Sequence, residues 1–247
     1  MRDADRFITS PQHQDKKTSK DLVSIILLGE NHGYRMKSYG SISLINIENK
    51  TLIEKQVDAI KAVFTNFEII LCSGFDAVKT AEFIRSKFTN INIRVVENQI
   101  HNHTNCCESI RLCMNNTTNN KFIICGGELL LTPNQLRKIN LNQSSIIIQE
   151  ENPIHNLDVG VIKEGDKLSN MALGIKTQNW CEILYLSNIK ISQELHNIVS
   201  TTDSKSKLMF EAINELIKYH TLNIVDSSDC PITKVNNIKT LRRISKS

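Results

Sequence analysis

Residues 22–33 read L-V-S-I-I-L-L-G-E-N-H-G and contain the strongest fold signal in the chain. Residues 22–28 form an apolar run, apart from one serine, with the length and β-branched content of a buried parallel strand. The run passes directly into a turn-forming cluster at 29–33. Ligands of open α/β sheets bind where such strands end, at the carboxyl edge. We therefore expect a binding loop at 29–33, with the cations Arg35 and Lys37 beside any bound anion. The two glycines also allow a simpler interpretation, a plain strand-to-helix turn.

The size and composition of the chain predict one α/β domain. A chain of 247 residues, 40% hydrophobic and 23% charged, can bury one good core but would be cramped as two full domains. No apolar run approaches the roughly 18 residues that a membrane span needs. We expect a flexible polar tail at 1–20, a single domain at 21–247, and no membrane partner.

Charge and cysteine usage narrow the function classes further. The net charge is only +4, the basic residues are scattered and 5% of residues are aromatic, so neither a basic stripe nor a stacking platform for nucleic acid is present. The seven cysteines include no C-x-x-C pair, which is typical of reduced thiols in a cytoplasmic protein. The first 20 residues lack the apolar segment of a secretory signal.

Strands and helices alternate through the first half of the sequence. A helix is predicted from Thr51, because Thr51 and Glu54 form a capping box ahead of an apolar stripe. Further strands are expected at 67–72, 91–96 and 121–125, and further helices at 77–88 and 107–114. Such units of about 30 residues indicate βαβ crossovers and a parallel sheet. The second half is less regular, with strands expected at 145–148, 158–163 and 180–186 and a helix at 205–218.

A second glycine turn follows the strand at 121–125. It reads G-G-E and ends at Glu128, an acidic residue at the mouth of a predicted central strand. A carboxylate in that place is a potential metal ligand. Asp158 and Glu182 receive no role from the sequence, and Trp180 with Tyr185 could either line an acceptor pocket or pack in the core.

Four segments, in order, match a known pattern. Residues 28–36 (L-G-E-N-H-G-Y-R-M) are similar to a first-strand motif L-A-A-G-x-G-x-R-M, and residues 49–54 (N-K-T-L-I-E) to the entry of the first helix. Residues 126–128 lie where the pattern has a strand ending Gly-Asp, and 234–241 (K-V-N-N-I-K-T-L) resemble its closing E-I-D-T-x-x-D-L. Over about 23–243 the chain thus resembles the sugar-phosphate and choline-phosphate nucleotidyltransferases, which include MobA-like proteins. The resemblance implies a GT-A-like fold, three α/β/α layers around a mostly parallel sheet.

The resemblance also implies a function and a site. The reaction would transfer an NMP group from an NTP to a sugar phosphate or phosphocholine-type acceptor, with release of pyrophosphate and with Mg²⁺ as cofactor. Catalytic groups would be Arg35, Lys37 and Glu128, and the metal ligands Glu128 and Asn236, with Asp226 as a rival for the second place. The nucleotide-binding residues would be Gly29, Glu30, Asn31, Gly33, Tyr34, Asn98, Asn105 and Ser109.

Four departures from the family pattern weaken the same chemistry. Glu128 stands in place of an aspartate and keeps an oxygen ligand that is one methylene longer. Ile42 stands where the family has a phosphate-binding lysine, and Glu30 brings a carboxylate to a place for small neutral residues. Asn236 offers a neutral carbonyl in place of a carboxylate. Two hypotheses stay open: an active nucleotidyltransferase, or a pseudoenzyme kept as a nucleotide-binding, structural or assembly component. A GT-A glycosyltransferase ranks last, because residues 126–129 contain one acid only. Homo-oligomer formation is left open.

Overall fold

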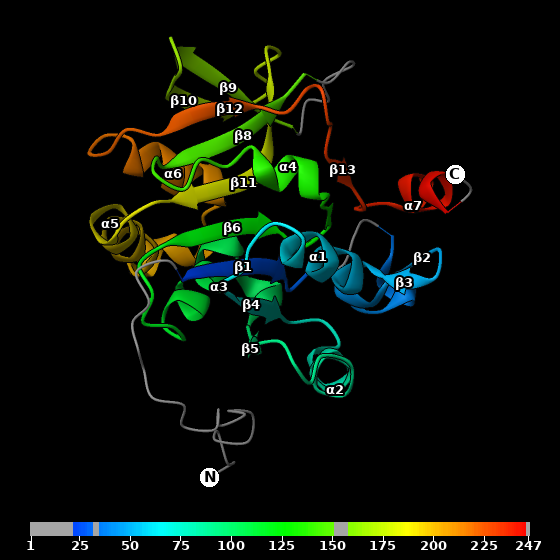
Figure 1. The fold of residues 1–247 in the computed structure, drawn as a ribbon. Coiled ribbons are helices and arrows are strands. Elements are labelled where there is room, and N and C mark those ends of the chain that lie inside the picture. Colours follow the sequence, from blue (N-terminus) through cyan, green and yellow to red (C-terminus); the bar gives the residue numbers. More distant parts are fainter. Residues whose placement is uncertain (1–21, 32–34, 151–157, 246–247) are drawn as a thin grey trace.

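A nine-stranded sheet organises the part of the chain that the computed structural model describes, residues 22–31, 35–150 and 158–245 (Figure 1). The strand order is β5-β4-β1-β6-β11-β8-β12-β10-β9. The strands are β1 (Val23–Gly29), β4 (Phe67–Ser73), β5 (Ile93–Glu97), β6 (Phe122–Gly126), β8 (Ser145–Gln149), β9 (Val159–Glu164), β10 (Lys167–Leu173), β11 (Asn179–Leu186) and β12 (Asn223–Asp226). The expected tail at 1–20 lies outside the described residues.

Helices cover both faces of the sheet (Figure 1). On one face, α1 (Leu52–Lys61), α2 (Ala77–Lys87) and α4 (Pro133–Arg137) contribute to one buried apolar cluster. On the other, α3 (Cys106–Met114), α5 (Ile189–Val199) and α6 (Met209–Leu216) contribute to a second. The β1 strand is buried along its whole length between the two clusters, as its apolar sequence predicts.

The sheet is mixed, which corrects the expectation of a mostly parallel one. The half formed by β5, β4, β1 and β6 is parallel throughout, as predicted. In the other half, β11 runs antiparallel to both β6 and β8, and β10 runs antiparallel to both β12 and β9. One physical reason is local: a tight turn with Gly165 at φ +61° joins β9 to β10, and so short a connection permits only antiparallel pairing.

Local signals were reliable in some places and wrong in others. The capping box is present, with the Thr51 amide donating to Glu54 Oε2 at 2.9 Å. The helix expected at 205–218 is wrong at its start, because 202–206 form a 3₁₀ turn and the α-helix begins at Met209. There the Ser204 hydroxyl donates to the Ile198 carbonyl at 2.6 Å, a local bond that competes with helix formation.

A third apolar cluster joins the segment after β1 to the end of the chain. Two short antiparallel pairs flank it, β2 (Asn46–Ile47) with β3 (Lys50–Thr51) and β7 (Leu129–Leu130) with β13 (Thr233–Lys234). The last helix is α7 (Ile238–Ile244). The cluster consists of Met36, Ile42, Ile45, Ile47, Leu52, Val235 and Leu241. It holds the C-terminal segment near the carboxyl ends of β1 and β6.

Candidate functional site

The carboxyl ends of β1 and β6 lie against each other. The Gly127 amide donates to the Leu28 carbonyl at 3.0 Å. A Cβ at Gly127 would come within 2.4 Å of that same oxygen, so only glycine allows the backbones to approach this closely. The two glycine turns that the sequence singles out therefore meet at one edge of the sheet.

Three charged side chains gather at the end of β6. Glu128 follows β6, Glu182 lies in β11 and Lys234 lies in β13. The Lys234 Nζ binds Glu182 Oε1 at 2.7 Å. A Cβ added at Gly126 would lie 2.6 Å from Glu182 Oε2 and 3.3 Å from Glu128 Oε2, so the two carboxylates face each other beside this glycine. All three side chains are half-buried.

A bulge in β11 directs the Glu182 side chain toward the end of β6. The register with β8 shifts between Trp180 and Leu184, and Glu182 has φ +60°. Positive φ is uncommon and unfavourable for a residue with a Cβ, and bulges often turn a side chain toward a site. The signal available in the sequence was that Glu182 is the one charged residue in a mostly apolar strand.

The surroundings of Glu128 and Lys234 set the protonation state of these two side chains. Burial raises the pKa of the Glu128 carboxyl to about 8, and the charge of Glu182 adds to the rise. Burial alone would lower the pKa of Lys234, but the neighbouring carboxylates, Glu182 first, raise it above its ordinary value. The Lys234 side chain is therefore an ammonium ion at neutral pH, beside a carboxyl group that is largely protonated.

The residues present do not fit the Mg²⁺ site that the resemblance implies. Asn236 is exposed, and its Oδ1 accepts a hydrogen bond from Asn237 Nδ2 at 2.8 Å. The rival Asp226 ends β12, three strand spacings or about 14 Å from β6, and its carboxylate binds Ser228. Across the described ranges, no group of three or more His, Cys, Asp or Glu is placed to hold a metal.

Three of the predicted nucleotide-binding residues come together next to the carboxyl end of β1. Glu30 is only 3% exposed, and its Oε2 has no hydrogen-bond partner. Burial raises the pKa of Glu30, while a hydrogen bond from Ser109 opposes the rise. Asn98 donates through Nδ2 to Ser109 Oγ at 3.1 Å, which links the end of β5 to α3.

The predicted cations Arg35 and Lys37 lie at the surface. The structure also explains why position 42, where the family pattern has a lysine, holds an isoleucine. Arg35 and Lys37 are exposed, and Lys37 Nζ lies 5.8 Å from the centroid of the Phe75 ring. Ile42 is 3% exposed and belongs to the third apolar cluster, so its position does not present a side chain to a phosphate.

The remaining predicted nucleotide-binding residues lie in different parts of the fold. Asn105 begins α3 and donates through Nδ2 to the Ser206 carbonyl at 2.5 Å, so this amide joins two segments of the fold. Gly29 ends β1 beside Ser43, and Asn31 is exposed. Gly33 and Tyr34 lie outside the described residues.

In three dimensions the chain resembles solved nucleotidyltransferases. The inositol-1-phosphate CTP transferase from T. maritima is 12% identical, with 92% of this chain and 96% of that chain covered and a TM-score of 0.74. A UDP-glucose pyrophosphorylase is 11% identical, with 91% and 97% covered and a TM-score of 0.73. The CTP:phosphocholine cytidylyltransferase of Streptococcus pneumoniae is 13% identical, with 91% and 98% covered and a TM-score of 0.72. The chain has the nucleotidyltransferase fold.

This fold confirms the resemblance read from the ordered motifs. No protein-family model and no curated protein matches the chain. At 11–13% identity the likeness establishes the architecture of this nucleotidyltransferase-fold chain and leaves its activity to be proposed. No helix within the described ranges is long and apolar enough to cross a bilayer.

Within the nucleotidyltransferase fold, the structure decides between the two roles that the sequence leaves open for Trp180 and Tyr185. Trp180 and Tyr185 are buried, with exposures of 3% and 1%, and they bind backbone carbonyls through Nε1 and OH. They belong to the core and not to an acceptor pocket. Sequence reasoning missed Lys234 and left Glu182 without a role, because the two residues are 52 positions apart and carry no shared pattern.

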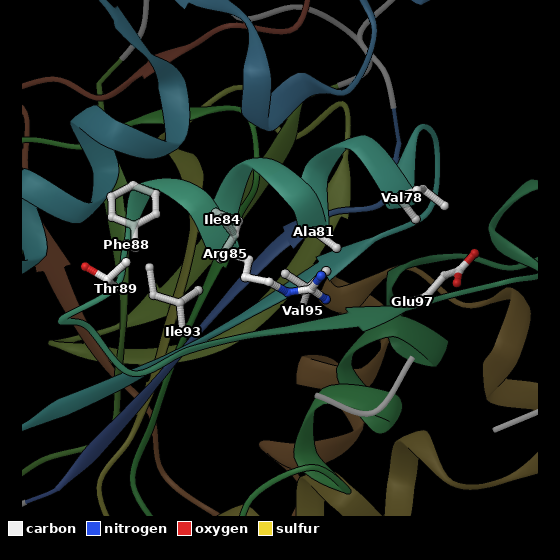
Figure 2. A pocket seen from close by; sticks show the side chains of 10 residues that line it. Val78, Ala81, Ile84, Arg85, Phe88, Thr89, Ile93, Val95 and Glu97 are labelled. Atoms are coloured by element: carbon white, nitrogen blue, oxygen red, sulfur yellow. The ribbon is translucent and has the colours of Figure 1, made fainter. Parts of the chain in front are cut away.

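A well-formed groove lies elsewhere on the fold, between α2 and the edge strand β5. Figure 2 shows side chains of α2, such as Ala81 and Arg85, on the side of the helix toward Ile93 and Val95 of β5. The groove holds about 280 Å³, and its lining is mainly apolar. Such a lining does not suit a triphosphate, so the charged side chains at the carboxyl ends of β1 and β6 mark the better candidate place for the nucleotide.

Proposed function

We propose that this chain binds an NTP in the crevice at the carboxyl ends of β1 and β6 and transfers the NMP group to a small phosphorylated acceptor. A phosphate oxygen of the acceptor attacks the α-phosphorus and forms a new P–O bond. The bond from the α-phosphorus to the bridging oxygen of the β-phosphate breaks, and pyrophosphate leaves with that oxygen. The observation that carries the proposal is the fold likeness over 92% of this chain and 96% of the T. maritima CTP transferase.

The charges of the crevice support phosphate binding. Lys234 presents an ammonium at the end of β6, and Arg35 and Lys37 lie on the segment that follows the β1 loop. Because the pKa of Glu128 is about 8, this carboxyl can donate a hydrogen bond to a phosphate oxygen at neutral pH. In this proposal no side chain of the protein binds Mg²⁺, because the Glu182 carboxylate already pairs with Lys234.

A second candidate is a nucleotide-binding protein without transferase activity. The observation in its favour is Ile42, which is packed in the third apolar cluster where the family pattern has a phosphate-binding lysine. This candidate predicts NTP binding without pyrophosphate release.

The test separates the two candidates by measuring binding and turnover in parallel. CTP, UTP, GTP and ATP are each offered with inositol 1-phosphate, a hexose 1-phosphate or phosphocholine, with and without Mg²⁺. Calorimetry measures binding, and phosphorus NMR detects pyrophosphate. We expect one NTP and acceptor pair to yield pyrophosphate, and Glu128→Ala to lower that rate about tenfold or more, as loss of a charge-stabilising group does.

The control variant is Asp229→Ala, an exposed carboxylate near the end of β12 that pairs with Lys138. Its rate should equal that of the unchanged protein. Binding of an NTP without pyrophosphate for any acceptor would favour the second candidate. Failure to bind any NTP would remove both.

A further inference from the structure

Lys234 is held by the backbone beside Glu128. Strand β13 pairs with β7, so that Lys234 lies opposite Leu129, the residue after Glu128. The next amide, that of Val235, donates to the Glu128 carbonyl at 2.8 Å. Val235 is fully buried in the third apolar cluster, which fixes this pairing. The position of Lys234 therefore follows from core packing and is not a chance of side-chain flexibility.

The Lys234 ammonium has room and hydrogen-bonding capacity for a ligand. Glu182 accepts one bond from Nζ at 2.7 Å, and an ammonium group has three donors. The side chain is 24% exposed and its partner Glu182 is 28% exposed, so the pair borders the crevice and is not sealed inside it. Glu182, the residue whose carboxylate binds this ammonium, is also the residue with the strained φ of +60°.

A divalent cation and this ammonium would compete for the same carboxylates. Glu128 and Glu182 face each other beside Gly126, and Lys234 already binds the second. A metal ion there would meet a fixed positive charge at short range, which is repulsive in a half-buried place. Asn236, the other expected ligand, is exposed and bonded to its neighbour Asn237.

We propose that the Lys234 ammonium, oriented by Glu182, neutralises the NTP phosphates in the place of a divalent cation, so that nucleotide binding by this chain does not depend on Mg²⁺. The inference rests on the proposed function, because it assumes that an NTP occupies the crevice. Lys234 acts as a phosphate-binding residue and Glu182 as its positioning residue. Neither role follows from the motifs, in which the metal is held by carboxylates.

The test compares NTP affinity in Mg²⁺ and in EDTA by calorimetry, for the full chain and for three variants. The unchanged protein should bind its NTP with similar affinity in both buffers. Lys234→Met should weaken binding in EDTA by about 10- to 100-fold, the loss expected for one charge-assisted hydrogen bond. Added Mg²⁺ should restore part of this loss, because Glu128 and Glu182 are then free to hold a metal. Lys234→Arg, which keeps the charge, should retain metal-independent binding.

The matched control is Lys138→Met. Lys138 also pairs with one carboxylate, Asp229, and its side chain is 25% exposed, but it lies at α4, away from the crevice. A titration of the free protein with Mn²⁺ provides a readout that needs no nucleotide: the unchanged chain should not bind the ion, and Lys234→Met should bind it. Thermal melting of each variant verifies that it is folded.

The outcomes distinguish this inference from the proposed function. NTP binding by the unchanged protein only in Mg²⁺, or equal affinities for Lys234→Met and Lys138→Met in EDTA, would overturn the role of Lys234 and leave the proposed function standing. Mn²⁺ binding by the unchanged chain that Glu182→Gln abolishes would also overturn it. Absence of NTP binding in both buffers would overturn the proposed function, and this inference with it.

Discussion

Glu128 is the residue from which the strongest pH dependence is expected. Its pKa is about 8 in the folded protein, against an ordinary value of 4.5. Between these values the folded chain holds a proton that the unfolded chain releases. The stability contribution of this proton is complete below about pH 4.5 and is lost as the pH rises through about 8.

Glu128→Gln should therefore change how stability depends on pH. From pH 5 to pH 8, we expect the free energy of unfolding of the variant to gain about 1–2 kcal/mol relative to the unchanged protein, allowing for partial exposure of the site. Urea denaturation at both pH values measures this difference. Glu164→Gln, at the exposed end of strand β9, is the control and should show no such gain. Parallel pH curves for Glu128→Gln and the unchanged chain would contradict the assignment.

At the scale of one element, the bulge in β11 makes a prediction about backbone conformation. Glu182 has φ +60°, a region that costs residues with a Cβ about 1–2 kcal/mol and costs glycine little. Glu182→Gly and Glu182→Ala both remove the carboxylate that binds Lys234. The glycine variant should nevertheless unfold with a free energy about 1 kcal/mol higher than the alanine variant.

The same pair of substitutions at an ordinary strand position gives the control for the bulge. Lys167 lies in β10, is exposed, pairs in register with Glu164 of β9, and has no positive φ. There the alanine variant should be the more stable one, since glycine costs entropy in a regular strand. Chemical denaturation measures the free energy of unfolding of all four variants. A more stable alanine variant at both positions would argue against the bulge geometry.

At the scale of the whole molecule, the third apolar cluster couples the C-terminal segment to the segment after the β1 loop. Leu241 of α7 is 6% exposed in this cluster, beside Val235. Leu241→Ala should cost about 2–3 kcal/mol locally, from lost burial and an unfilled cavity. Hydrogen exchange should then accelerate at residues 36–47 and around Lys234, while β4 keeps its protection.

Val78→Ala is the control for this prediction, because Val78 is 51% exposed on α2 and lies outside the cluster. Its exchange pattern should match that of the unchanged chain. Equal acceleration along the whole sheet after Leu241→Ala would mean that the cluster is not a separate unit of stability.

Local patterns in the sequence determined much of the parallel half of the fold. The run at 22–28, the alternation of strands and helices up to β6, and the Thr51 capping box all act between residues close in the chain, and each was correctly predicted. The glycine turns at 29 and 126–127 also indicated their common edge of the sheet, because parallel strands share their carboxyl ends.

Only the tertiary structure decided how β11 enters the sheet and which charged side chains meet at the end of β6. The antiparallel insertion of β11 between β6 and β8 depends on pairing between segments that are distant in sequence. The residue pattern of a single strand does not specify which other strand it pairs with. The choice between Asn236 and Asp226 as a metal ligand likewise had no local answer: Asn236 is exposed and binds Asn237, and Asp226 ends β12, three strand positions away from β6 in the sheet. The pair of Lys234 with Glu182 joins residues 52 positions apart, through a bulge and a short strand held by core packing. Such contacts arise from long-range packing, whereas helix and strand periodicity record only local structure.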